Sequence, residues 1–187
     1  MLKIAVPSLV GLALAGASFA LTVQPPDAPP MPKPSKEHDF LKQFVGEWES
    51  SGECTMSPGQ TVQCKGADKV RMLGGFWMVS DGTGEIVGMK MENVLTLGYD
   101  PEKKKYIGQW VDSMLPHAWR YEGEVDESGR KIILHTSGPS PKSPGKTCKF
   151  RETFEFKSAD ERIFTSSYQE DGGQWTQMVT LTAKRKK

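Results

Sequence analysis

The chain has 187 residues, which is room for one domain of ordinary size once an amino-terminal signal is set aside. Its 24 basic residues nearly balance its 23 acidic residues, and the one basic cluster is the terminal run at residues 184–187. Because nucleic-acid binding needs a basic face or stripe, this composition excludes nucleic acid as the expected partner.

Residues 1–20 have the pattern of a secretory signal peptide. Lys3 supplies the positive charge, residues 4–16 form an apolar run, and Ser18 and Ala20 are small residues at the expected cleavage positions. The apolar run is too short to span a bilayer, so we expect no stable membrane insertion. The sequence therefore predicts a protein located in the periplasm or secreted.

Residues 21–36 contain six prolines, a density that disfavours both helix and strand pairing. We expect a disordered, stiff linker here, which leaves residues 37–187 as the folded domain. At the start of that domain Phe40, Leu41 and Phe44 fall at helical spacing. This spacing predicts one short helix.

From Phe44 onward, apolar and polar side chains alternate with a period of two. In the first segment Trp48 and Cys54 share one face, while Glu47 and Glu49 share the other. Turn residues separate the segments, and residues 82–84 (Gly-Thr-Gly) are one such predicted turn. We expect about ten strands, drawn from residues 44–56, 62–72, 76–81, 85–91, 93–99, 106–114, 118–125, 131–136, 148–156, 163–168 and 175–184.

This pattern predicts an all-β fold, a single antiparallel up-and-down β-barrel. Closure is favoured because it leaves no exposed edge strand. Barrels of eight or more strands are wide enough to hold a small ligand. The short helix would then either cover the open end of the barrel or pack beneath its floor.

Cys54 and Cys64 lie on the same face of neighbouring segments, on either side of a Pro58-Gly59 turn. In an exported protein these two residues could form a disulfide, and closing so small a loop would stabilise the fold by about 2 to 3 kcal/mol. The alternative is that both are reduced and buried, together with Cys148.

Four motifs resemble the bacterial family called domain of unknown function 1579: Gly46-x-Trp48, residues 97–101 (LGYDP), residues 106–114 and Lys184-Arg185. The resemblance covers residues 38–187. It implies a barrel like those of the lipocalins and fatty-acid-binding proteins, the calycins, and it implies no activity. In lipocalins a basic residue near the end of the last strand lies over the ring of the Gly-x-Trp motif. The resemblance therefore implies a cation–π contact between Arg185 and Trp48.

The richest group of chemistry-bearing residues spans residues 106–121. Aromatic side chains with one carboxylate and one imidazole would line a mostly apolar pocket with few polar groups, as is usual for a small-ligand site. The alternative is that the aromatic residues are plain core, with the carboxylate and the imidazole facing solvent. The candidate residues are Tyr106, Trp110, Asp112, His117, Trp119 and Tyr121.

Glu152 is a further candidate because it shares its strand face with Cys148, Phe150, Phe154 and Phe156. A carboxylate on an apolar face is costly unless it is paired or hydrogen-bonded. Three explanations stay open. The residue could pair with an inward arginine, it could bind a ligand, or it could mark a bulge that reverses the faces of the strand.

No metal or cofactor is expected, because His38, His117 and His135 lack ligand spacing, and no common catalytic motif occurs. We expect reversible binding of a small apolar molecule inside the barrel. One alternative is a hydrolase or isomerase that uses Asp112 and His117 with Tyr121. The other is a structural or interaction module of the cell envelope with a filled barrel. The pattern carries no information on the oligomeric state.

Overall fold

The computed structural model describes residues 30–57 and 59–187. The predicted signal peptide and most of the predicted linker lie outside these residues. The chain divides into two units, Met1–Pro32 and Lys33–Lys187, and every helix and strand described belongs to the second unit. None of the described helices is long and apolar enough to cross a membrane.

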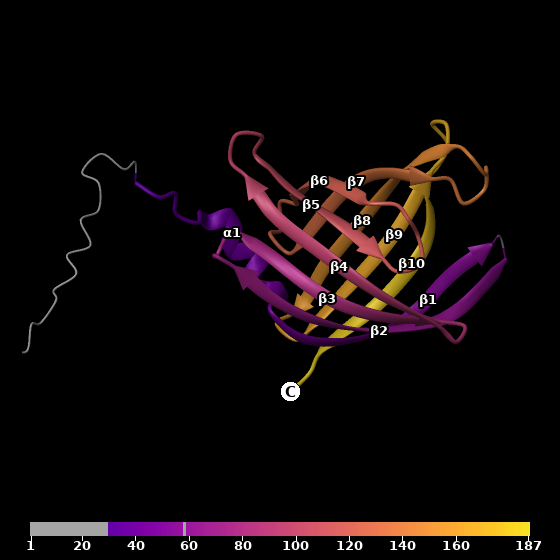
Figure 1. The fold of residues 1–187 in the computed structure, drawn as a ribbon, viewed down its shortest axis with the longest axis horizontal. Coiled ribbons are helices and arrows are strands. Elements are labelled where there is room, and N and C mark those ends of the chain that lie inside the picture. Colours follow the sequence, from indigo (N-terminus) through magenta and orange to yellow (C-terminus); the bar gives the residue numbers. More distant parts are fainter. Residues whose placement is uncertain (1–29, 58) are drawn as a thin grey trace, which may run out of the picture. The chain divides into compact units, whose positions relative to one another are not determined.

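Two short helices, α1 (Lys36–Leu41) and η1 (Lys42–Phe44), precede ten strands that form a closed antiparallel barrel (Figure 1). Each strand pairs with the next along the chain, and β10 returns to pair with β1. The predicted fold class, an all-β up-and-down barrel of about ten strands, is confirmed. The strands are β1 (Gly46–Ser57), β2 (Gln60–Leu73), β3 (Trp77–Ile86), β4 (Met89–Asp100), β5 (Lys105–Asp112), β6 (Trp119–Val125), β7 (Lys131–Pro139), β8 (Thr147–Ser158), β9 (Glu161–Gln169) and β10 (Thr176–Arg185).

The turn predicted at residues 82–84 is wrong, because β3 continues through them in unbroken register with β2 and β4. The chain turns instead at Val87 and Gly88, whose φ angles of 52° and 78° suit a two-residue hairpin. Gly82 has a different reason for lacking a side chain. A Cβ there would lie 2.4 Å from the side chain of Asn93 and 2.8 Å from that of Asp68. Glycine within a strand marks such a close approach.

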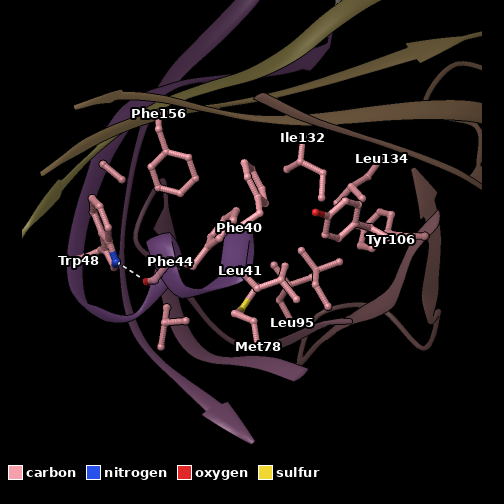
Figure 2. Close-up of a cluster of buried hydrophobic side chains, with 14 residues drawn as sticks. Phe40, Leu41, Phe44, Trp48, Met78, Leu95, Tyr106, Ile132, Leu134 and Phe156 are labelled. Atoms are coloured by element: carbon pink, nitrogen blue, oxygen red, sulfur yellow. Dashed lines mark hydrogen bonds between the residues drawn. The ribbon is translucent and has the colours of Figure 1, made fainter. Parts of the chain in front are cut away.

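The two helices pack into one end of the barrel, which we call the closed end. Phe40, Leu41 and Phe44 are buried there with Trp48 and Phe156, as Figure 2 shows. The indole Nε1 of Trp48 donates a hydrogen bond of 2.7 Å to the carbonyl of Phe44. The short helix was expected either to cover the open end of the barrel or to pack beneath its floor. In the structure it packs beneath the floor. No described helix covers the other end, which we call the open end.

The buried core extends from the closed end toward the middle of the barrel and includes Met78, Leu97, Ile132 and Leu134. A smaller cluster lies toward the open end. It consists of Cys148, Phe150 and Tyr168, with Trp119 and Met178 packed against it.

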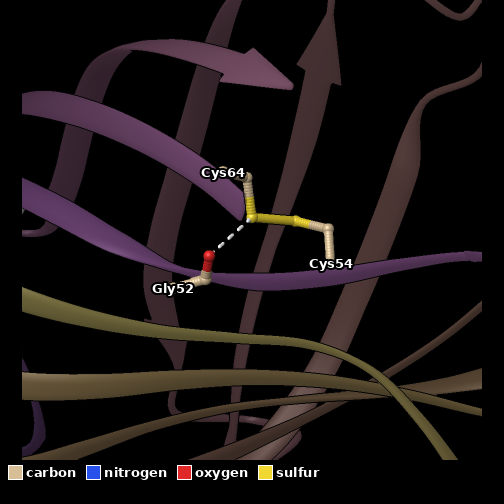
Figure 3. Close-up of a disulfide and its surroundings, with 3 residues drawn as sticks. All are labelled: Gly52, Cys54 and Cys64. Carbon is tan, nitrogen blue, oxygen red and sulfur yellow. Dashed lines mark hydrogen bonds between the residues drawn. A yellow bond between two sulfur atoms is a disulfide. The ribbon is translucent and has the colours of Figure 1, made fainter. Parts of the chain in front are cut away.

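A disulfide joins Cys54 on β1 to Cys64 on β2, with the two Cα atoms 6.2 Å apart (Figure 3). The sulfur of Cys64 lies 3.7 Å from the carbonyl oxygen of Gly52. Because a disulfide sulfur carries no hydrogen, this approach is a contact and not a hydrogen bond. Cys148 is a free, buried thiol.

Candidate functional site

The floor of the barrel is fixed by Arg185 at the end of β10. Its guanidinium lies 4.2 Å from the centre of the Trp48 ring and donates hydrogen bonds to the carbonyls of Gln43 (3.1 Å), Val45 and Ala159 (2.8 Å). The cation–π contact implied by the family resemblance is therefore present. One side chain ties the helix end, the first strand and the β8–β9 turn together.

Gly46 is required beside this arginine for two reasons. Its φ of 127° is a backbone conformation that residues with a side chain rarely adopt. A Cβ at this position would also lie 2.5 Å from Nη1 of Arg185. The Gly-x-Trp motif thus serves to admit the arginine over the indole.

An ion pair between the buried Arg162 and the partly buried Asp68 lies inside the barrel just above the floor, and the sequence did not predict it. Nη2 of Arg162 donates a hydrogen bond of 3.0 Å to Oδ2 of Asp68, and its guanidinium lies 4.4 Å from the centre of the Trp48 ring. The Arg162 side chain is 4% exposed. Burial lowers the pKa of Arg162 to about 10, and Asp68 opposes this change. Arg162 therefore remains charged at neutral pH.

Above the floor, apolar side chains face the interior of the barrel and are partly exposed to solvent. Phe164 on β9 is the cross-strand partner of Phe154 on β8 and of Leu181 on β10, and such partners lie on one face of a sheet. Phe154 packs against the buried core, so Phe164 and Leu181 face inward. Both are only partly buried. A ten-stranded barrel is wider than the eight-stranded size that side chains fill.

Glu152 on β8 is the buried carboxyl of this interior. It lies between Leu134 and Ser166 in unbroken register, so no bulge reverses the strand at this point. Oε1 accepts a hydrogen bond of 3.0 Å from the hydroxyl of Ser166. Within residues 30–57 and 59–187, Oε2 is buried without a hydrogen-bond partner and no arginine pairs with the carboxyl. Burial raises the pKa of Glu152 from the usual 4.5 to about 8.

Tyr121 on β6 is a residue predicted from the sequence whose pKa is influenced by Glu152. Its side chain is buried. Burial raises the pKa of the Tyr121 hydroxyl well above its usual value, and the negative charge of Glu152 raises it further. The phenol therefore stays protonated and can act as a hydrogen-bond donor near the carboxyl.

Trp119 and His117 lie toward the open end. The Trp119 ring packs edge-on against Phe150, with the ring centres 4.7 Å apart, and against His117 at 4.8 Å. In the part of the chain that the structure describes, the buried indole Nε1 of Trp119 has no hydrogen-bond partner. Nε2 of His117 lies 3.4 Å from the carbonyl oxygen of Ser137. Trp119 therefore packs against the smaller apolar cluster, and His117 packs against Trp119.

Asp112 holds the loop that follows β5. Its Oδ1 accepts hydrogen bonds from the backbone N–H groups of Met114 (2.6 Å) and Leu115 (2.9 Å). Among the described residues, no hydrogen bond or ion pair joins Asp112 to His117. The direct contact that an acid–base pair would use is therefore not made in this structure.

Tyr106 and Trp110 contact other parts of the barrel. The Tyr106 hydroxyl donates a hydrogen bond of 2.9 Å to the carbonyl of Glu37, which fastens α1 to the barrel wall. Burial raises the pKa of Tyr106 to about 12, with Glu37 and Tyr99 adding to the effect. Trp110 pairs with Trp119 across β5 and β6 and packs against the main core.

Two hollows open on the outside of the barrel. The first, of about 570 Å³, lies between α1 and the barrel wall beside Tyr106. The second, of about 440 Å³, lies over β3, β4 and β5 and is lined by Val94, Val111 and Asp112 among others. Neither is lined by Glu152. The described residues contain no group of three or more His, Cys, Asp or Glu that could hold a metal ion.

These features define a class of protein, a calycin-like antiparallel barrel that is plugged at one end by a helix. The chain belongs to the family described as Protein of unknown function (DUF1579), whose model matches residues 33–185. The family resemblance seen in the sequence is thereby confirmed. No curated protein matches the chain.

The solved structures that share this fold include the following two. The S-type phycobiliprotein lyase CPES from Guillardia theta has a TM-score of 0.50 and 18% sequence identity, covering 82% of this chain and 94% of that chain. Rv2717c from M. tuberculosis has a TM-score of 0.58 and 12% identity, covering 83% of this chain and all of that one. At such low identities the likeness concerns the fold alone.

Proposed function

We propose that this protein binds a small, largely apolar molecule reversibly inside the barrel, between the floor and the open end. The observation that carries the proposal is Oε2 of Glu152, a buried carboxyl oxygen without a partner in the described chain. Buried polar atoms in folded proteins are almost always hydrogen-bonded, so an exception calls for an explanation. A bound molecule that supplies the missing partner is such an explanation.

The apolar surroundings support a largely apolar ligand. Phe164 and Leu181 face the interior without being fully buried, and Phe154 contacts Phe164 with ring centres 4.8 Å apart. Removing apolar surface of this kind from water contributes roughly 25 cal/mol for each Å². A few polar groups within an apolar lining are the usual composition of a small-ligand site.

The proposed place of action is outside the cytoplasm, in the periplasm or the extracellular medium. The sequence pattern of residues 1–20 supports export. The Cys54–Cys64 disulfide supports it as well, because disulfides persist mainly in oxidising compartments.

Native mass spectrometry of the mature protein, purified from its own cells, tests the proposal. The expected result is a stoichiometric adduct, which denaturing extraction releases for identification. Leu181→Trp should displace the adduct because the larger ring occupies the interior. Thr182→Trp, on the outward face of the same strand, is the matched control and should retain it.

A clean apo mass that persists after incubation with fatty acids and an envelope lipid extract would contradict the proposal. That result would favour the filled-barrel interaction module instead. An adduct that survives Leu181→Trp but not Thr182→Trp would move the binding site to the outside of the barrel.

A further inference from the structure

The ionisable side chains inside the barrel differ in whether they have a partner of opposite charge. Arg162 is paired with Asp68 at 3.0 Å, so these two charges offset one another. Arg185 is held by carbonyl oxygens and Asp160 at the floor. Glu152 has only the hydroxyl of Ser166 as a partner among the described residues. Nη1 of Arg162 also lacks a hydrogen-bond partner among the described residues. The charge of Arg162 is nevertheless offset by Asp68, whereas no cation pairs with the carboxyl of Glu152 in the described chain.

Aromatic rings extend from Glu152 toward the open end, and one of them already accepts a cation. Nζ of Lys142, in the β7–β8 loop, lies 5.4 Å from the centre of the Tyr168 ring. Tyr168 packs with Phe150, which in turn packs against Trp119. The faces of such rings attract ammonium groups, most strongly where water is excluded. A positive charge close to these rings would therefore be stabilised.

The geometry points to an aliphatic amine as the ligand class: an alkylammonium group binds at Oε2 of Glu152 and its apolar chain lies against Phe164 and Leu181. This inference rests on the proposed function, because it names the chemistry of the molecule that the interior holds.

The protonation step follows from the state of the free carboxyl. Burial raises the pKa of Glu152 to about 8, so the free protein carries a carboxylic acid at neutral pH. An arriving alkylammonium ion keeps its own proton, while Glu152 releases its proton to solvent and becomes a carboxylate. The product is one ammonium–carboxylate hydrogen-bonded pair and one proton in solution. Charge-assisted hydrogen bonds of this kind are about twice as strong as neutral ones.

Three probes with the same alkyl chain separate the ligand classes: decylamine, decanol and decanoic acid. Each is titrated calorimetrically into the apo protein at neutral pH, below its solubility limit and below the concentration at which the amine or the acid forms micelles. A hydrogen bond to a charged group increases affinity by about tenfold to a hundredfold, and loss of the Glu152 proton one pH unit below its pKa of about 8 costs about tenfold. We therefore expect decylamine to bind several-fold, up to about tenfold, more tightly than decanol. We expect decanoic acid to bind most weakly. Titrations in buffers of different ionisation enthalpy should show a proton released with decylamine alone.

Glu152→Gln tests the residue itself. It should abolish both the preference for decylamine and the proton release. Glu155→Gln is the matched control, because Glu155 lies on the opposite face of the same strand and pairs with Lys131 at 3.0 Å. That variant should behave as the wild type does.

The outcomes separate this inference from the proposed function. Equal binding of decylamine and decanol, or tightest binding of decanoic acid, would overturn the amine assignment and leave the proposed function intact. A decylamine preference that survives Glu152→Gln would overturn the role of Glu152. Failure of all three probes to bind the wild type would count against the proposed function itself. The order of the three affinities for the wild type tests the amine assignment even if Glu152→Gln does not fold.

Discussion

The hydroxyl of Ser166 donates a hydrogen bond of 3.0 Å to Oε1 of Glu152, while Oε2 of the same carboxyl is buried without a partner in the described chain. The fold therefore satisfies one oxygen of the carboxyl and leaves the other. An unsatisfied buried polar group costs about 1 to 3 kcal/mol. A barrel that needed only a filled core would be more stable with an apolar side chain at this position, so the carboxyl is more readily explained by binding than by stability.

The contribution of Glu152 to the stability of the wild type should fall as the pH rises from acid to neutral and above. The pKa of Glu152 is raised in the folded state, from 4.5 to about 8, so the folded state binds more protons than the unfolded state between these values. The contribution of Glu152 is therefore greatest below pH 4.5 and is lost as the pH rises through 8, by about 1.4 kcal/mol per pH unit. Urea unfolding across this range measures it.

Glu152→Gln should remove this part of the pH dependence, since glutamine has the same shape and does not titrate. Glu155→Gln provides the comparison. Lys157 and Lys131 lower the pKa of Glu155, so its loss should alter the profile only at acid pH. A Glu152→Gln profile parallel to that of the wild type between pH 4.5 and 8 would show that the carboxyl is not buried as described.

Asp68→Asn should destabilise the protein strongly because it leaves the charge of Arg162 buried without a counterion. Removing one member of a buried ion pair typically costs about 3 to 5 kcal/mol. Chemical denaturation of the apo protein measures the loss. Asp81→Asn, an exposed carboxylate on the neighbouring β3, should change stability by no more than about 0.5 kcal/mol. Equal effects of the two substitutions would mean that the pair contributes nothing.

The inward face of each strand could be predicted from the alternation of side chains, and this was sufficient for several residues of the site. The alternation placed Cys54 and Cys64 on one face, and the two residues form a disulfide in the structure. The alternation also placed Glu152 on a face with apolar residues, and in the structure Glu152 is 6% exposed. Neither result needed tertiary information, because a period of two determines the face of a residue once the strand is known.

The ion pair of Arg162 with Asp68 could not be predicted in the same way. The predicted strand began at Ile163, an apolar residue, which left Arg162 outside it. In the structure β9 begins at Glu161 and places Arg162 on the inward face beside Trp48. The two partners are 94 positions apart in the chain. Only the closure of the barrel brings them together, and no local sequence pattern indicates a contact between residues so far apart in the chain.

Replacement of both Cys54 and Cys64 by serine should destabilise the fold. The bridge closes a loop with a sequence separation of 10, for which the chain-entropy model gives about 2 to 3 kcal/mol. Urea unfolding of the variant measures the loss. Alkylation of the denatured wild type without reductant should label Cys148 alone. Three labelled thiols would mean that the bridge does not form in the isolated protein.

Arg185→Lys should weaken the floor of the barrel although it keeps the positive charge. Lysine cannot reproduce the planar fork that bonds the carbonyls of Gln43, Val45 and Ala159 at once. Hydrogen bonds from a charged group contribute about 1.5 to 3 kcal/mol each, and the contact with the Trp48 ring adds about 0.5 to 2 kcal/mol. Because the side chain is 26% exposed, we expect a net loss near the lower end, roughly 2 kcal/mol.

The same experiment separates closure of the barrel from general stability. Hydrogen exchange should show faster exchange of the Lys186 amide, which bonds to the carbonyl of Glu47 across the closed end. Lys184→Gln, an exposed neighbour on β10, is the control and should leave both the exchange rate and the unfolding midpoint unchanged. If Arg185→Lys slows exchange or leaves it as in the wild type, then β1 and β10 are held together by their ladder alone, and the arginine over Trp48 does not fasten the floor.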